Sequence, residues 1–128
     1  MALAQITGRS LFYSRTGEGE PLLLIQGLSG THASWGPEFL DALGPDLELI
    51  AYDHRGIGDS GAIDGPFTIP DLARDAAELL DALGLESAHV LGISMGGMIA
   101  QELALGHPER VRTLTLGCTY PGGPQSRI

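Results

Sequence analysis

Apolar residues in this chain gather in runs that are followed by a glycine or a polar residue. Four of these runs are continuous or nearly so: Leu22–Gln26, Leu47–Tyr52, Ala88–Ile93 and Val111–Leu116. Runs of this kind are typical of strands buried on both faces of a parallel sheet. Two earlier runs, Leu3–Thr7 and Leu11–Ser14, are joined by Gly8-Arg9 and predict a hairpin of two short strands.

Between these runs the apolar residues recur at helical spacing. Thr68 and Asp71 form a predicted capping box at the start of the longest pattern. The apolar positions that follow continue to Leu83, and Gly84 ends the helix. Two shorter helices are also predicted: Ser34–Leu43 and Met95–Leu105. Strands that alternate with helices predict an α/β fold, a mostly parallel sheet flanked by helices. The length of 128 residues predicts one domain over residues 1–128.

The pattern Gly-x-Ser-x-Gly occurs at Gly92, Ser94 and Gly96. In a nucleophile elbow the serine occupies a sharp turn between a strand and a helix, so that its hydroxyl is exposed at the carboxyl end of the strand. Here the motif follows a predicted buried strand and opens a predicted helix, and the glycines allow close backbone approach. The pattern therefore predicts Ser94 as a catalytic nucleophile. The alternative is that Ser94 is only a small residue in a tight turn.

A second glycine-rich turn, Gln26–Gly30, follows the first buried strand and is expected at the same edge of the sheet. A helix that begins at Ser94 directs free N–H groups and the positive end of its dipole toward that edge. We therefore predict the backbone N–H groups of Leu28 and Met95 as donors to a developing oxyanion. The alternative is an ordinary turn between strand and loop.

Together with Asp53–Ser60, these segments resemble the α/β-hydrolase superfamily. The run Gly92–Val111 is most similar to its single-domain esterase, enol-lactonase and cofactor-free haloperoxidase branch. The resemblance covers Leu11–Thr119 and implies the N-terminal part of an α/β-hydrolase core, without the C-terminal strands and cap. It also implies structural roles for Arg55 and Asp59 in the loop after the second buried strand.

The chain departs from this family in two places. Gln26 stands where many relatives carry His, but the family uses the backbone N–H that follows, so the resemblance still implies activity. The family also places an acid and then a His after the serine. After Ser94 the carboxylates are Glu102 and Glu109, and the one imidazole is His107. At 1.5 Å per helical residue His107 is roughly 20 Å from the serine, whereas a general base acts at about 3 Å.

The other histidines do not replace the missing base. His32 lies in the region of the glycine-rich turn and His54 ends a strand, so both are placed to line the cleft, while His89 begins a buried strand and is expected to be structural. We therefore expect a second polypeptide segment to supply the acid and the His. It is either a separate chain or the product of a break near Tyr120–Pro124, where the family's cap would begin, and it would hold the C-terminal tail in place.

These observations predict a serine hydrolase that acts on carboxylic esters or lactones through an acyl-enzyme at Ser94, without a cofactor. One alternative keeps the catalytic residues and changes the reaction to cofactor-free perhydrolysis, the haloperoxidase activity. The other is a non-catalytic remnant of the fold, because fold alone does not establish function.

Composition restricts the partners. Sixteen acidic and seven basic side chains give a net charge of −9, which disfavours nucleic acid and anionic membranes. The start of the chain, Met1–Ile6, lacks the features of a secretory signal, and no apolar run is long enough to span a bilayer, so a cytoplasmic location is expected. The single cysteine, Cys118, is expected to be a small buried apolar residue. The four histidines are scattered, so we expect no metal site.

Overall fold

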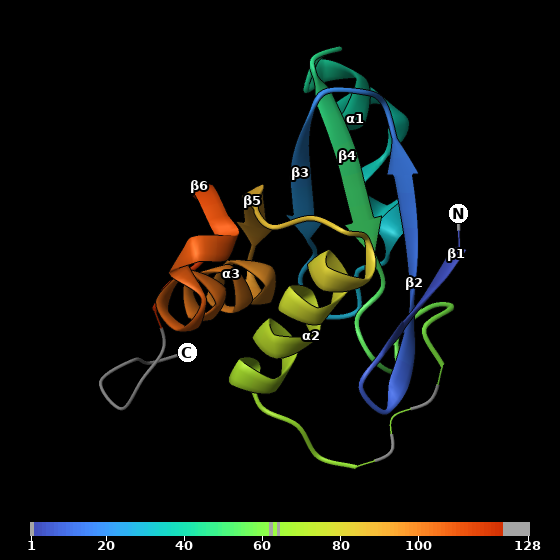
Figure 1. Cartoon of the computed structure of the whole chain (residues 1–128), viewed down its shortest axis with the longest axis vertical. Coiled ribbons are helices and arrows are strands. Elements are labelled where there is room, and N and C mark those ends of the chain that lie inside the picture. The colour runs from blue at the N-terminus through green and yellow to red at the C-terminus, as the bar shows by residue number, and fades with distance from the viewer. Residues whose placement is uncertain (1, 62, 64, 122–128) are drawn as a thin grey trace.

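In the described part of the chain, six strands and the helices between them follow one another in the order that the sequence pattern predicts (Figure 1). The computed structural model describes residues 2–61, 63 and 65–121. The elements in chain order are β1 Ala2–Ile6, β2 Arg9–Thr16, β3 Glu20–Ile25, the 3₁₀ helix η1 His32–Trp35, α1 Pro37–Ala42, β4 Leu47–Tyr52, α2 Ile69–Ala82, β5 Ala88–Ile93, α3 Met95–Gly106, the 3₁₀ helix η2 Pro108–Arg110, and β6 Val111–Gly117. The predicted hairpin of β1 and β2 is confirmed.

The described strands form one mixed sheet in the order β1-β2-β4-β3-β5-β6. Strands β4, β3, β5 and β6 are parallel, and the hairpin adds two antiparallel strands at one end. From β3 the chain first moves to β4 on one side and later reaches β5 on the other side. The order of strands therefore reverses at β3, and ligands of open α/β sheets bind beside the carboxyl ends of the strands at such a switch point.

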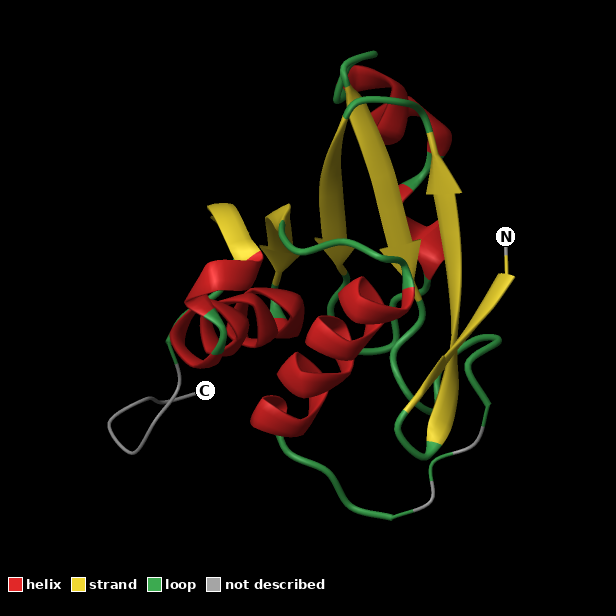
Figure 2. Ribbon diagram, in the orientation of Figure 1, coloured by secondary structure: helices red, strands yellow, loops and turns green. Residues whose placement is uncertain are grey.

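The two faces of the sheet carry separate apolar clusters, which confirms the predicted α/β fold. Helices α2 and α3 lie side by side on one face, where they cover Leu23, Ile25 and Val90 (Figure 2). On the other face Trp35 and α1 cover Leu22 and Leu24. Because successive side chains of a strand point to opposite faces, a continuous apolar run such as that of β3 supplies both clusters.

The two longer helices begin and end close to their predicted limits. The side chain of Thr68 accepts a hydrogen bond from the Asp71 N–H, and Asp71 bonds back to the Thr68 N–H, so the predicted capping box is present at the start of α2. After α2, Gly84 has a positive φ of 74°, a conformation that favours glycine. Helix α3 covers Met95–Gly106.

The predicted helix over Ser34–Leu43 is wrong as a single element. It is divided into η1 and α1 at Gly36, whose φ of 80° lies outside the helical region. A residue that precedes proline is disfavoured in the helical conformation, and Pro37 lacks the N–H that would continue the hydrogen bonds of η1. The Gly-Pro pair therefore separates the two short helices.

The predicted burial of Cys118 is wrong, and β6 has a neighbouring strand on one side only among the described strands. Strand β6 is an edge strand that pairs with β5 and is packed by α3, so Leu114 and Leu116 remain 39% and 40% exposed. Cys118, which follows β6, is exposed and has a positive φ of 50°. Among the described residues no helix is long and apolar enough to cross a membrane. The predicted cap start and tail fall mainly on residues 122–128, outside the described residues.

Candidate active site

Ser94 lies at the carboxyl end of β5 and directly precedes α3. Its backbone has φ 53° and ψ −124°, and its side chain is exposed at the edge of the sheet. Such a conformation costs a non-glycine residue about 1–3 kcal/mol, and strain of this kind occurs mainly at functional sites. The structure therefore places Ser94 in the sharp turn that the sequence motif predicts.

The glycines on either side of Ser94 allow backbone segments to touch. A Cβ atom placed on Gly92 would lie 2.3 Å from the carbonyl oxygen of Gly96. A Cβ atom on Gly96 would lie 2.1 Å from the carbonyl oxygen of Ile25 and 2.7 Å from that of Gln26. Only glycine fits at these contacts. The Gly92 contact packs the end of β5 against the first turn of α3, and the Gly96 contacts hold that turn against the end of β3, which brings the two predicted parts of the site together.

The glycine-rich turn after β3 lies beside the serine hydroxyl. The Cβ position of Gly27 is 3.2 Å from the Ser94 Cβ and 3.6 Å from its Oγ. Leu28 comes next and is exposed, and Met95 directly follows the serine. In the described part of the chain, the N–H groups of Leu28 and Met95 have no protein hydrogen-bond acceptor. Both predicted oxyanion donors are thus adjacent in sequence to residues in contact at this turn, Gly27 and Ser94, and stay predictions.

Residues after β6 fix the backbone of Ser94, and the sequence reasoning missed them. The Ser94 N–H donates to the Gly117 carbonyl at 3.0 Å, and the Thr119 hydroxyl donates to the Ser94 carbonyl at 2.7 Å. The Thr119 side chain occupies a space that Gly97 leaves open, because a Cβ on Gly97 would lie 2.5 Å from the Thr119 Cβ. A second glycine after the motif was the available signal.

The loop after β4 is organised by the buried carboxylate of Asp53. One oxygen of Asp53 accepts hydrogen bonds from the His32 backbone N–H at 2.6 Å and from its ring Nδ1 at 2.8 Å. The other oxygen accepts from the Asp59 N–H at 2.9 Å. Burial raises the pKa of Asp53, but the hydrogen bonds from Asp59 and His32 together outweigh burial and hold that pKa below its usual range.

Potential metal-ligand atoms of His32, Asp53 and Asp59 lie within 4.8 Å of one another. The expectation that the histidines are too scattered to join such a cluster is therefore wrong for His32, because the fold brings this residue to the loop after β4 that carries Asp53 and Asp59. N–H donors already occupy both oxygens of Asp53. These hydrogen bonds account for the arrangement as part of the loop structure.

Arg55 has the structural contacts that the family resemblance implies. Its Nε and Nη2 donate to the two oxygens of Asp75, each at 2.8 Å, and both residues are buried. The guanidinium also lies 5.4 Å from the centre of the Phe67 ring. Arg55 therefore ties the loop after β4 to α2. Asp59 is exposed and contributes its backbone N–H to the same loop.

None of the four histidines is hydrogen-bonded to the Ser94 hydroxyl within the described residues. His32 is paired with Asp53, and His54 is buried with its Nε2 2.7 Å from the Gln26 carbonyl oxygen. Burial lowers the pKa of His54. His89, near the start of strand β5, contacts Thr113 and Glu20, and His107 is the C-cap residue of α3. The described residues thus bring the predicted nucleophile and the predicted oxyanion donors together, and no described histidine is hydrogen-bonded to that serine.

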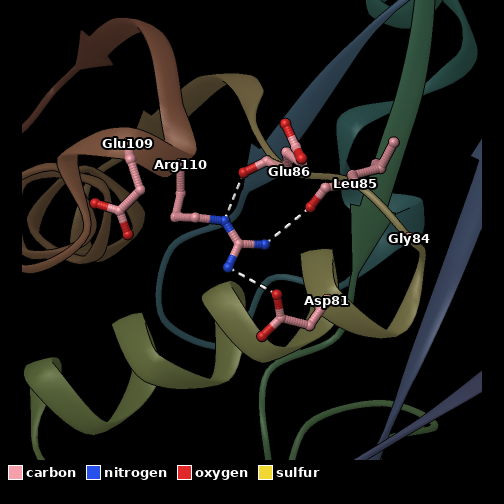
Figure 3. Close-up of a pocket in the computed structure, with 6 residues that line it drawn as sticks. All are labelled: Asp81, Gly84, Leu85, Glu86, Glu109 and Arg110. Atoms are coloured by element: carbon pink, nitrogen blue, oxygen red, sulfur yellow. Dashed lines mark hydrogen bonds and ion pairs between the residues drawn. The ribbon is translucent and has the colours of Figure 1, made fainter.

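A hollow of 540 Å³ lies at the opposite edge of the sheet, near the amino ends of β5 and β6 (Figure 3). Arg110 lines it and donates to the carbonyl oxygens of Glu86 at 2.6 Å and Leu85 at 2.8 Å, while its Nη1 pairs with Asp81 at 2.7 Å. These contacts join the loop after α2 to η2. The hollow is therefore stabilised by structural contacts and lies away from Ser94.

The match to known families agrees with this geometry. Residues 20–126 match the family described as alpha/beta hydrolase fold, and the chain belongs to that family. RutD from Azorhizobium caulinodans, whose name describes a carbamate hydrolase, is 48% identical over 106 residues, which are 83% of this chain and 40% of that protein. A poly(3-hydroxyalkanoate) depolymerase from Ectopseudomonas oleovorans is 40% identical over 102 residues, 80% of this chain and 36% of that protein.

Solved structures show the same fold. A hydrolase from Pseudomonas aeruginosa has a TM-score of 0.88 and 38% identity, and the match covers 96% of this chain and 48% of that chain. The enol-lactonase from Burkholderia xenovorans has a TM-score of 0.83 and 32% identity, and the match covers 88% of this chain and 45% of that chain. The chain thus spans less than half the length of these relatives. The expectation of a single domain over residues 1–128 stays a prediction.

Proposed function

We propose that this chain is the nucleophile-bearing part of a hydrolase that acts on carboxylic esters or lactones through an acyl-enzyme at Ser94. The observation that carries the proposal is the strained backbone of Ser94 at the switch point of the sheet, with Gly27 packed against its side chain. Two available N–H groups flank that hydroxyl. The acidic balance of the chain fits the cytoplasm, which we propose as its compartment.

The proposed reaction needs no cofactor. The Ser94 Oγ attacks the carbonyl carbon and gives its proton to a histidine, while the carbonyl oxygen becomes an oxyanion that accepts hydrogen bonds from Leu28 and Met95. Collapse of this intermediate expels the alcohol, which takes the proton from the histidine. Water then loses a proton to the same histidine and attacks the acyl group, and the acid leaves as the proton returns to Ser94.

A second polypeptide segment supplies the acid and the histidine in this proposal. No described histidine is hydrogen-bonded to Ser94, and β6 is an edge strand among the described strands. Its side chains Leu114 and Leu116 are exposed, as is Tyr120 after it. An unpaired edge strand with apolar side chains is suited to pairing with a further strand. Since both parts would share one apolar core, their interface would exceed the roughly 1,600 Å² of ordinary complexes. We call this chain together with that segment the complete hydrolase.

Carbamate hydrolysis is the second candidate reaction. It is favoured by the 48% identity to RutD, although the chain covers 40% of that protein. Esters, lactones and carbamates all pass through a tetrahedral oxyanion, so the same N–H donors serve each of them. Cofactor-free perhydrolysis would also use the same residues, and only the accepted nucleophile, peroxide in place of water, separates it from hydrolysis.

The test is turnover by the complete hydrolase and by its Ser94→Ala variant on a panel of p-nitrophenyl esters, γ-lactones and aryl carbamates. We expect ester or lactone turnover by the wild type and a loss of at least about a thousandfold in the variant. Turnover by Ser94→Ala within tenfold of the wild type would exclude Ser94 as the nucleophile. A wild type inactive on the whole panel would favour the non-catalytic remnant.

The proposed second segment has a separate test. Residues 1–128 are expressed alone and compared with the complete hydrolase by gel filtration and near-UV circular dichroism. We expect the chain alone to aggregate or to lack the near-UV signal of fixed aromatic side chains, because β6 would expose its apolar side. A cooperatively folded, esterolytic monomer would refute the need for a partner and would direct attention to His32 and His54 as bases.

A further inference from the structure

His54 is a buried titratable side chain that the proposed reaction does not use. It follows Asp53 at the end of β4, is 3% exposed, and its Nε2 lies 2.7 Å from the carbonyl oxygen of Gln26. A carbonyl oxygen can only accept a hydrogen bond, so Nε2 must carry the proton. The bond joins the end of β4 to the last residue before the glycine-rich turn.

Both sides of the peptide between Gln26 and Gly27 are held by side chains. Its carbonyl accepts from His54, and its N–H, which belongs to Gly27, donates to the Gln26 Oε1 at 3.0 Å. The Gln26 side chain in turn packs under the turn, because a Cβ on Gly30 would lie 2.0 Å from the Gln26 Cγ. The glycine-rich turn thus packs around the Gln26 side chain, and His54 fixes the orientation of the peptide between Gln26 and Gly27.

The same carbonyl touches the nucleophile helix. A Cβ on Gly96 would lie 2.7 Å from the Gln26 oxygen, so this oxygen is confined between α3 and His54. Gly27, on the other side of the peptide, lies against Ser94. Because Leu28 directly follows Gly27, a displacement of this peptide would also move the Leu28 N–H relative to Ser94. The orientation of this one peptide therefore sets the geometry of the site.

We propose that His54 is a positioning residue that holds the oxyanion turn against Ser94 by donating its Nε2–H to the Gln26 carbonyl. The inference rests on the proposed function, because it assigns a role to the Leu28 N–H in that reaction. His54 acts through Gln26 and does not touch the substrate. It also explains how a chain with Gln26 before the glycine keeps the turn ordered.

Two substitutions separate the hydrogen bond from the packing of the ring. The His54 ring lies edge-on to Tyr52, with 5.3 Å between ring centres. His54→Phe keeps an aromatic ring for that contact and removes the donor. His54→Gln loses the ring but places an amide nitrogen at the same number of bonds from Cα as the imidazole Nε2. The glutamine variant therefore tests rescue by the donor alone.

The experiment measures kcat, KM and phenylboronic acid affinity of the complete hydrolase and both variants. Phenylboronic acid forms a tetrahedral adduct with an active serine and so requires the oxyanion donors. We expect His54→Phe to lower kcat roughly 10- to 100-fold, to change KM less than about threefold, and to weaken phenylboronic acid binding by the same factor as kcat. His54→Gln should recover most of kcat and of the boronate affinity.

The outcomes distinguish this inference from the proposed function. An active wild type with a His54→Phe variant of equal kcat and boronate affinity would overturn the inference alone. Equal losses in the Phe and Gln variants would also overturn it, because the donor would not matter. A wild type that neither turns over esters nor binds the boronate would overturn the proposed function, and the inference with it.

A second measurement does not depend on the folding of any variant. The tautomer of His54 is read from the ¹⁵N chemical shifts of the wild-type imidazole. We expect a proton on Nε2, consistent with donation to the Gln26 carbonyl. A neutral ring protonated only on Nδ1 would overturn the inference even if His54→Phe fails to fold.

Discussion

The two edges of the sheet are built in different ways. At the carboxyl edge, Ser94 and the turn at Gly27 are held by backbone contacts that only glycine permits, such as those of Gly96. At the amino edge, long side chains join β3, β5, β6 and α2, and the carboxylates of Glu20 and Asp81 are each 65% exposed. A close backbone contact also occurs there, because a Cβ on Gly19 would lie 2.0 Å from the Asp46 carbonyl oxygen. Close-packed backbone cannot yield to an added atom, whereas exposed ion pairs are weak and adaptable. The backbone contacts around Ser94 should therefore tolerate less change than the ion pairs of the amino edge.

This contrast predicts that substitutions at the carboxyl edge are far more damaging than substitutions of charged residues at the amino edge. Each of the following variants tests one side of the comparison in the complete hydrolase. We expect the largest effect where a substitution forces two backbone segments apart. Loss of hydrogen bonds from a hydroxyl or a guanidinium should have a smaller effect, and loss of one exposed carboxylate the smallest.

Gly96→Ala should have the largest effect. The added Cβ would lie 2.1 Å from the Ile25 carbonyl oxygen, so β3 and α3 must separate. We expect a loss of about 3 kcal/mol in the free energy of unfolding, measured by urea denaturation, together with the loss of ester turnover. The matched control is Gly106→Ala in the same helix, where a Cβ would meet nothing within 4 Å. If both variants are equally stable, the close packing of the elbow is disproved.

Thr119→Val should have the next effect. It keeps the shape of the side chain and removes the hydroxyl that donates to the Ser94 carbonyl at 2.7 Å. We expect a loss of about 1 kcal/mol in the free energy of unfolding and a several-fold slower reaction of Ser94 with a fluorophosphonate. Thr119→Ser retains the hydroxyl and should react at nearly the wild-type rate. Equal rates for the valine variant and the wild type would show that this hydroxyl does not position the serine.

Arg110→Met tests the amino edge. The variant loses the ion pair with Asp81 and two hydrogen bonds to the carbonyls of Leu85 and Glu86. We expect the free energy of unfolding, measured by thermal denaturation, to fall by about 1–2 kcal/mol. The kcat should be unchanged, because these contacts lie away from Ser94. Arg74→Met, which breaks an exposed pair with Asp71, is the control and should cost less than about 0.5 kcal/mol. A large fall in kcat for the Arg110 variant would contradict the separation of the two edges.

Glu20→Gln should have the smallest effect on the free energy of unfolding. Its hydrogen bond with His89, and the charge of that ring, lower its pKa from the ordinary value of 4.5. A lowered pKa stabilises the fold above the pKa of the unfolded chain, and this contribution is lost as the pH falls through the folded-state pKa. The stability difference between wild type and Glu20→Gln should therefore shrink from pH 6 to about pH 3, as measured by urea denaturation at each pH. A difference that grows on acidification would reverse the assigned direction.

The sequence was sufficient for those features that depend on local pattern. The apolar runs predict β3, β4 and β5, the capping box of Thr68 predicts the start of α2, and the serine motif predicts the turn at Ser94. Each of these signals lies within a few residues of the feature it specifies. The break at Gly36-Pro37 was also visible locally, although the helical spacing around it obscured it.

Contacts between distant residues could not be predicted. The Thr119 hydroxyl reaches the Ser94 carbonyl across 25 positions, and His54 reaches Gln26 across 28. Neither pair has a periodic or compositional signal, because the contacts arise only when neighbouring strands are placed in register. The exposure of Cys118 has the same cause, since burial depends on which element covers a residue and not on its own chemistry.

The central claim, that Ser94 is an activated nucleophile, is tested most directly by covalent labelling. The complete hydrolase is treated with a fluorophosphonate, digested and examined by mass spectrometry, with Ser94→Ala treated in parallel. We predict one adduct per chain, located on the peptide that contains Ser94 and absent from the variant. A wild type that remains unlabelled at Ser94, or is labelled at another serine while ester turnover is lost, would contradict the account.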